Sequence, residues 1–285
     1  YIFIVLFSSF NYISTTKNNK MKKLLLFTLL VLFSCSKSDE VPDENNNQTE
    51  NILLVKEITH QDVEETNYSY KDEYFYDGAK LERYVTKGYN NNQLTGSATY
   101  NITYTNNLIV DITSEYGTYK FSYDTSGRLE QSTYCDNDIS CGNPDRVLYS
   151  YSNSDKTITA DDYSQGNLVY RSIVQLDSNN NVISIKETDL LDNSSFTVNL
   201  QYDNFKSPFL NITGAVALIS PTSYLTSASL FAMKNNCVSY QDESDYNVTF
   251  DYDYNDDGYP RQVITNEVGY GSGNMQLLYV SVNND

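Results

Sequence analysis

The acidic turn near the C-terminus has the residue types of a calcium loop. Asp253, Asn255 and Asp257 are followed by Gly258, which gives the pattern D-x-N-x-D-G that opens an EF-hand loop. Position twelve of such a loop should be a bidentate Glu, and here it is Ile264. The flanking segments also alternate as strands do, not as helices. We therefore predict no metal site, and keep Asp253, Asn255 and Asp257 as a weak calcium candidate at a solvated turn.

Neighbouring acids could supply the two carboxylates of a glycosidase. Glu64–Glu65 and Asp161–Asp162 are such pairs, and the reaction needs carboxylates about 5–10 Å apart across a cleft. Adjacent residues of a strand point to opposite faces, so neither pair would meet over one substrate. Any Ser–His–Asp or Cys–His site would have to use His60, the only histidine. We predict no catalytic residues and no cofactor, with a glycan-processing envelope enzyme as the alternative.

Tyrosine dominates the aromatic residues of the chain, which holds 27 Tyr and 12 Phe but no Trp. Over residues 68–76 tyrosines recur at even spacing, the period of a strand with one aromatic face. Such a face can stack on sugar rings or hold an apolar ligand. Its rings can equally pack against one another across strands and hold the sheet. The candidate ligand-facing aromatics are Tyr74, Tyr76, Tyr104, Tyr123 and Tyr151.

Tandem β-hairpins are the elements that must position these residues. In the best-preserved copy a strand from Phe121 ends in Tyr123-Asp124, turns at Gly127 and restarts at Leu129. Looser copies end their first strands at residues 76, 104, 151, 176, 202 and 254. They imply a unit of about 25 residues that buries its apolar face only beside its neighbours. We predict an all-β fold over residues 52–285, a single large twisted and curled antiparallel sheet with open edges.

One stretch, Asn204 to Asp242, breaks this rhythm. It contains the least polar run outside the N-terminal region, with proline on both sides of that run. Ile212, Ala215, Val216 and Ile219 follow a helical spacing. We predict a short helix or compact loop packed on the concave tyrosine face of the sheet. The alternative is a mobile lid over a pocket.

The first 51 residues indicate where the protein is exported and how it is tethered. The first methionine is Met21, and two lysines after it precede the apolar run Leu24–Phe33. That run is too short to cross a bilayer, which takes about 20 residues, but it fits a signal peptide. We predict that residues 1–20 are not translated and that residues 21–34 are a signal peptide. Residues 35–51 are polar and acidic, and we predict a disordered tether there.

Leu32-Phe33-Ser34-Cys35 resembles the lipobox of bacterial lipoproteins. The resemblance implies that Cys35 is lipidated and attaches the protein to a membrane, and Ser36 after it implies the outer membrane. Lys37 followed by Asp39-Glu40 resembles the export signal of surface-exposed lipoproteins. We expect an outer-membrane, lipid-anchored protein at the cell surface. A periplasm-facing position is the alternative, as is an ordinary signal peptide with a chance cysteine.

The segment from Tyr123-Asp124 to Gly127-Arg128-Leu129 resembles the YD repeat of Rhs-type shell proteins, and Tyr76-Asp77 is a partial copy. With its acidic tether, the chain resembles uncharacterised bacterial outer-membrane lipoproteins with degenerate YD repeats. The resemblance covers residues 52–285. It implies a long twisted antiparallel sheet and carries no known catalytic residues. Rhs shells close over their cargo with many more repeats, so we expect an open sheet here.

The cysteines and the net charge limit the possible disulfides and binding partners. In an oxidising compartment Cys135 and Cys141 are the disulfide candidates, although pairing of Cys237 with either one stays open. The formal charge of −18 repels nucleic acid, so we exclude nucleic-acid partners. We predict a monomeric, non-enzymatic structural or binding domain, attached to the membrane through Cys35. Its further partner is expected to be a glycan or another envelope protein.

Overall fold

A computed structural model describes residues 51–62, 67–136, 144–152, 156–215, 233–243, 246–267 and 271–283. Strands make up most of this part of the chain. In order they are β1 (Asn51–Asp62), β2 (Tyr68–Asp77), β3 (Lys80–Asn90), β4 (Gln93–Thr105), β5 (Leu108–Thr113), β6 (Gly117–Tyr123), β7 (Leu129–Asp136), β8 (Asp145–Tyr151), β9 (Thr157–Ser164), β10 (Asn167–Leu176), β11 (Val182–Asp189), β12 (Ser195–Tyr202), β13 (Cys237–Asp242), β14 (Asn247–Tyr254), β15 (Pro260–Glu267) and β16 (Gly271–Asn283). The all-β prediction is confirmed.

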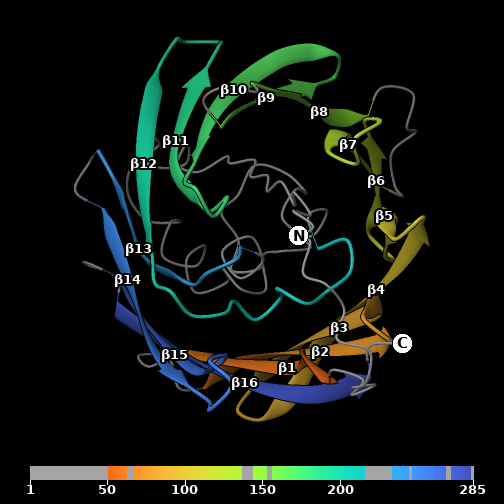
Figure 1. The fold of residues 1–285 in the computed structure, drawn as a ribbon, viewed down its shortest axis with the longest axis vertical. Helices are drawn as coiled ribbons and strands as arrows, with labels where there is room; N and C mark the ends of the chain where they lie inside the picture. Colours follow the sequence, from red (N-terminus) through yellow and green to blue (C-terminus); the bar gives the residue numbers. More distant parts are fainter. Residues whose placement is uncertain are drawn as a thin grey trace, which may run out of the picture.

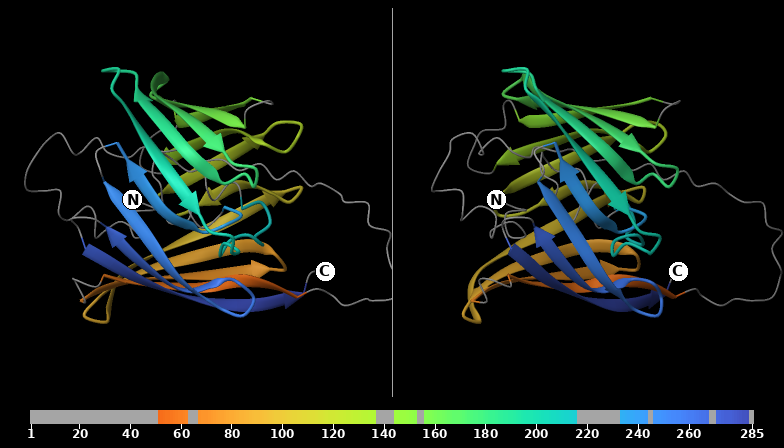
Figure 2. Two further views of the ribbon diagram at one scale, coloured as in Figure 1. Left: turned by 60° about the vertical axis from the view of Figure 1, so that its left-hand side comes forward. Right: turned by 90° about the vertical axis from the view of Figure 1, so that its left-hand side faces the viewer.

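The strands close into a single antiparallel barrel. Each strand pairs with its neighbours in the sequence, and β1 pairs with β16 from Asn51↔Asn283 to Asp62↔Gly273. Figure 1 shows the closed ring, with orange β1 beside blue β16, and Figure 2 shows the tilt of its strands. The prediction of an open sheet was therefore wrong. Closure pairs the backbone N–H and C=O groups that the first and last strands would otherwise expose at two sheet edges.

Alternation along each strand divides the side chains between the two faces of the barrel wall. The inward positions form one continuous buried core, which includes Tyr100, Phe121, Leu129, Val174 and Val263. The outward positions are mostly polar, as in the exposed Thr99, Asn101 and Thr103 of β4. The predicted period of two is thus the period with which the chain separates its apolar core from its polar surface.

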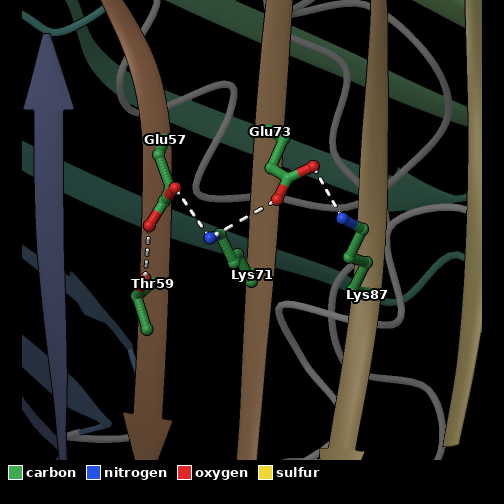
Figure 3. A network of polar contacts seen from close by, with 5 residues as sticks. All are labelled: Glu57, Thr59, Lys71, Glu73 and Lys87. Carbon is green, nitrogen blue, oxygen red and sulfur yellow. Dashed lines mark hydrogen bonds and ion pairs between the residues drawn. The ribbon is translucent and has the colours of Figure 1, made fainter. Parts of the chain in front are cut away.

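An ion-pair ladder lies on the outer face of β1, β2 and β3 (Figure 3). Lys71 Nζ lies 2.8 Å from Glu57 Oε2 and 3.4 Å from Glu73 Oε1, and Lys87 Nζ lies 2.7 Å from Glu73 Oε2. These side chains are partly exposed. The charges therefore sit in the middle of the strands, on the side that faces away from the core.

The Asp of the Tyr-Asp signature builds the hairpin turn. Asp124 Oδ1 accepts the backbone N–H groups two and four residues later, each at 2.9 Å, and its Oδ2 accepts Arg128 Nε at 2.7 Å. Gly127 supplies the required positive φ of 76°. The same pattern recurs at Asp177 and at Asn255. The signature is a structural device of the turn.

The β12–β13 connection crosses the barrel as a strap, which we define as residues 203–215. The strap is a run of turns and lies inside the ring of strands, as the cyan segment in Figure 1. Asn211 Nδ2 donates to Leu53 O at 2.9 Å, and Thr213 N donates to Ala79 O at 2.9 Å. Its buried apolar side chains are Phe209, Ile212 and Ala215. The predicted compact loop against the concave face is therefore present.

The predicted helix at the strap was wrong for the residues described. Gly214 has a φ of 71°, and a Cβ there would lie 3.0 Å from the backbone oxygen of Asn107. A helix cannot pass through such a residue, so the helical spacing of Ile212 and Ala215 arises from consecutive turns. Val216 and Ile219 lie outside the described residues. In the described ranges, no helix is long and apolar enough to cross a membrane.

Candidate functional site

The two ends of the barrel differ, and we name them for what they carry. The strap end holds the turns at residues 77–80, 105–108, 123–129, 176–182 and 254–260, together with the strap. The acidic end holds the turns at residues 90–93, 113–117, 164–167 and 189–195. Most of the aromatics predicted from the sequence lie at the strap end, whereas an unpredicted group of carboxylates lies towards the acidic end.

At the strap end, tyrosine hydroxyls donate to backbone carbonyls that lie beside β-bulges. Tyr123 OH donates to Ile109 O at 2.6 Å, where Val110 is the extra residue of a bulge in β5. The arrangement repeats around the barrel. The other pairs are Tyr76 to Val55, Tyr151 to Leu129, Tyr252 to Cys237 and Tyr279 to Pro260, at 2.6 to 2.8 Å. Each tyrosine therefore donates to a carbonyl of the preceding strand next to a bulge, where the ladder is locally disrupted.

Tyr104 and Tyr74 contact the strap. Tyr104 OH accepts Leu81 N at 3.1 Å and donates to Thr213 O of the strap at 3.1 Å. Tyr74 packs edge-on against Phe209, with ring centroids 5.4 Å apart. All the candidate aromatics thus face inward and take part in the core. Their role in ligand binding stays a prediction.

The weak calcium candidate lies in the β14–β15 turn. Asp253 Oδ2 accepts Arg261 Nε at 2.6 Å. Asn255 Oδ1 accepts the N–H groups of Asp257 and Tyr259. Two of the three side chains are therefore already engaged within the hairpin. Among the residues that the structure describes, no group of three or more His, Cys, Asp or Glu is placed to hold a metal ion.

The cysteines lie in different surroundings. Cys135 is disulfide-bonded, and its predicted partner Cys141 lies outside the described residues, as does Cys35. Cys237 is buried and carries no disulfide. Burial raises the pKa of its thiol to about 12, so the thiol is inert at neutral pH.

The sequence-predicted acid pairs do not form a catalytic dyad. Asp161 points outward, where Arg171 Nε donates to its Oδ1 at 2.6 Å. Asp162 points inward, and burial raises the pKa of its carboxyl to about 6. The two carboxylates thus lie on opposite faces of β9, as the period of a strand requires. Glu64–Glu65 lie outside the described residues.

A group of inward-facing carboxylates that we did not predict lies towards the acidic end. Its members lie on five strands, β2, β9, β11, β13 and β15, and are Asp72, Asp162, Glu187, Asp242 and Glu267. Among the described strands, no Lys or Arg shares the inner face there. Burial raises the pKa of Glu267 to about 7, although the hydroxyl of Tyr246 donates to this carboxylate and opposes the rise. This end of the barrel therefore concentrates acidic groups in poorly hydrated positions.

Asp72 is a buried member of this group whose carboxyl has a raised pKa. It is 5% exposed, and burial raises the pKa of its carboxyl to about 6 despite a hydrogen bond from Thr86. Its Oδ1 is buried and has no hydrogen-bond partner in the described part of the chain. The sequence held a signal for this residue, because Asp72 occupies a tyrosine position in the even-spaced series 68, 70, 72, 74 and 76.

A ladder of tyrosine rings lies beside Asp72. The rings of Tyr74 and Tyr84 have centroids 6.0 Å apart, and those of Tyr84 and Tyr100 lie 4.5 Å apart with planes 17° from parallel. Burial raises the pKa of each of these phenols, and the charge of Asp72 raises all three further. The carboxylate and the three rings are therefore close enough to act on one group.

Comparison with known proteins identifies the fold. No known protein family and no curated protein matches the sequence. A porin-like protein from Bacteroides uniformis has a similar structure, with a TM-score of 0.52 and 14% identity over 79% of this chain and 96% of that chain. A chain of the TcdB2–TccC3 structure aligns with a TM-score of 0.24 and 11% identity over 75% of this chain and 15% of its own length.

The porin-like protein shows that this barrel architecture occurs in a solved structure. Identity this low shows the fold alone. The TcdB2–TccC3 alignment is too weak to support the resemblance to YD repeats.

Proposed function

We propose that this chain is a non-enzymatic lipoprotein of the bacterial outer membrane, anchored through a lipid on Cys35, whose barrel stands in water and serves as a binding domain. One observation carries the proposal: the outer face of the barrel is mostly polar and carries charges, with apolar side chains such as Leu278 scattered on it, while its inner face holds the aromatic core. A barrel of this polarity suits water on the outside, so its attachment to the membrane must come from elsewhere.

Charges in the middle of the outer face argue against burial in lipid. Lys71 and Lys87 of the outer ladder lie in mid-strand, as does the Asp161–Arg171 pair on the wall formed by β9 and β10. A Lys or Arg on the lipid face of a membrane barrel costs about 2–4 kcal/mol at the midplane. Membrane barrels instead present an outward apolar band about 25 Å tall. In water these charges stay hydrated, so they carry no such free-energy penalty.

The inner face also differs from that of a water-filled pore. Tyr100, Leu129 and Ile158 are each about 1% exposed or less. The strap crosses one end of the barrel and contacts β1, the β2–β3 turn and the β4–β5 turn. A porin lumen is polar and hydrated. The barrel is better suited to bind a partner, including one that enters from an open end, than to conduct solutes.

The lipobox-like Cys35 supplies the attachment that the barrel lacks. The acidic residues 35–51 would join it to β1 as a tether. Surface exposure follows from the resemblance of residues 37–40 to an export signal, and a glycan or another envelope protein is the expected partner of a monomeric barrel. The enzyme alternative gains no support, because Asp161 and Asp162 divide between the two faces of β9.

Replacing the anchor tests the proposal. The full-length Cys35→Ala variant should leave the membrane fraction and remain folded and monodisperse in buffer without detergent. Cys237→Ala, which alters a buried cysteine of the barrel, should stay membrane-bound like the natural sequence. If Cys35→Ala stays with the membranes and needs detergent for extraction, the barrel itself holds the membrane and the proposal fails.

A further inference from the structure

We propose that the inner face of the barrel beside Asp72 binds an organic cation, a ligand that bears an ammonium or guanidinium group. The inference rests on the proposed binding function and names its site and ligand class. The carboxylate of Asp72 would hold the positive charge, and the rings of Tyr74, Tyr84 and Tyr100 would pack against the rest of the cationic group.

The unpartnered oxygen of Asp72 is the first observation. Asp72 lies on β2, paired with Ile58 of β1 on one side and with Thr86 of β3 on the other. Thr86 engages the carboxylate, while Oδ1 is buried and lacks a donor in the described chain. Buried carboxylates usually have a donor for each oxygen, because an unsatisfied one is costly. A ligand N–H would supply the donor that the described residues do not.

The tyrosine ladder is the second observation. Three rings on three neighbouring strands stand in one row next to the carboxylate. The face of an aromatic ring attracts a cation within about 6 Å of its centroid. The ladder hydroxyls are not used to bind the bulge carbonyls at the strap end.

The wall next to this site has small side chains. Gly88 of β3 and Gly96 of β4 are paired directly, and both lie two inward positions beyond the ladder towards the acidic end, one beyond the level of Asp72. A Cβ added at Gly88 would meet the ring of Tyr70 at 3.5 Å. A Cβ added at Gly96 would meet no atom within 4 Å. Space for a group approaching from the acidic end is thus present at Gly96, two strands from Asp72 and one inward position closer to that end.

The charge on the inner face selects a cation over a neutral or anionic ligand. The inward acids Asp162, Glu187, Asp242 and Glu267 share that face, with no Lys or Arg among the described residues to balance them there. The chain as a whole carries a formal charge of −18. Such a field raises the local concentration of cations at the mouth of the barrel.

Calorimetry with spermidine on the full-length protein in detergent tests the inference at pH 8. We expect saturable binding that Asp72→Asn weakens at least tenfold. Asp111→Asn, which removes an acid from the outward face of β5, should change the affinity less than twofold. Maltotriose, a neutral polyhydroxylated probe, should not bind. Absence of spermidine binding, or equal affinity in Asp72→Asn, would overturn the assignment.

A steric variant gives a second test that leaves Asp72 in place. Gly96→Leu fills the open space at Gly96, between the ladder and the acidic end, and should abolish spermidine binding. Its match is Ser97→Leu, which places the same side chain on the outer face one residue later and should bind normally. Binding that survives Gly96→Leu would contradict the site. If maltotriose binds and spermidine does not, this inference fails while the proposed binding function stands.

Discussion

The strap end and the acidic end are built from the same strands but treat their buried polar groups in opposite ways. At the strap end, tyrosine hydroxyls meet bulge carbonyls and Asn or Asp side chains close the turns. Towards the acidic end, carboxylates are buried where their pKa values rise, as at Asp72, Asp162 and Glu267. The difference indicates that stability is concentrated at the first end, whereas the second keeps groups that are poorly placed for stability and suited to binding.

Asp203 should show the largest effect, because it fastens the strap. Its carboxylate accepts Phe205 N at 2.9 Å, Asn236 N at 3.1 Å and the hydroxyl of Tyr254. Asp203→Ala leaves these donors without an acceptor and should lower the free energy of unfolding by about 3–5 kcal/mol. Urea unfolding measures the loss. Asp256→Ala in the exposed β14–β15 turn should change the free energy of unfolding by less than about 0.5 kcal/mol. A loss at Asp256 equal to that at Asp203 would show that Asp203 does not fasten the strap.

Asp72 should show the opposite behaviour, which depends on pH. Its pKa rises from 3.8 in the unfolded chain to about 6 in the barrel, mainly through burial. The folded state therefore favours the protonated carboxyl, so this contribution to stability is full below pH 4 and is lost as pH rises through 6. It amounts to about 3 kcal/mol.

The variant Asp72→Asn should remove this part of the pH dependence and leave the barrel at least as stable as the natural sequence at pH 8. Urea unfolding from pH 4 to pH 8 measures both effects. Asp111→Asn on the outer face is the matched control and should keep the natural slope. A slope unchanged by Asp72→Asn would show that this carboxylate is not the strained group at the acidic end.

Tyr123 tests the hydrogen bonds from tyrosine hydroxyls to bulge carbonyls at the strap end. Each of these bonds should contribute less to the free energy of unfolding than the bonds of Asp203. Tyr123→Phe removes the hydroxyl that donates to Ile109 O, the carbonyl of a fully buried residue. The free energy of unfolding should fall by about 1–2 kcal/mol. Tyr163→Phe on the outer face of β9 keeps the ring under Arg146 and should cost less than about 0.5 kcal/mol. Equal effects at both positions would contradict a structural role for the strap-end hydroxyls.

Local structure was predictable from the sequence, because alternation and turn residues are local signals. Tyr123-Asp124 and Gly127 marked a hairpin turn, and the turn forms through the side chain of Asp124. Tyr74 and Tyr76 marked an aromatic face, and both lie inward. These residues specify their own conformation or that of their neighbours, so no distant contact was needed to interpret them.

Closure and strain were not predictable, because both depend on distant partners. The alternation of apolar and polar residues predicts which side chains of β1 and β16 face the core, but it does not predict that these two strands pair with each other. The bulges at residues such as Val110 appear only when two strands are in register. Asp72 stood in a row of tyrosines, yet only burial by neighbouring strands makes its carboxyl unusual. The helical spacing around Ile212 misled because Gly214 follows it with a positive φ.

Labelling of the outer wall tests the central claim most directly, that a lipid-anchored barrel stands in water. Thr99 is exposed in mid-strand on the outer face of β4, and Asn199 occupies a similar position on β12. Thr99→Cys and Asn199→Cys in native membranes should react with a water-soluble maleimide as fast without detergent as with it. Labelling that appears only after detergent is added would place the barrel wall in lipid and contradict the account.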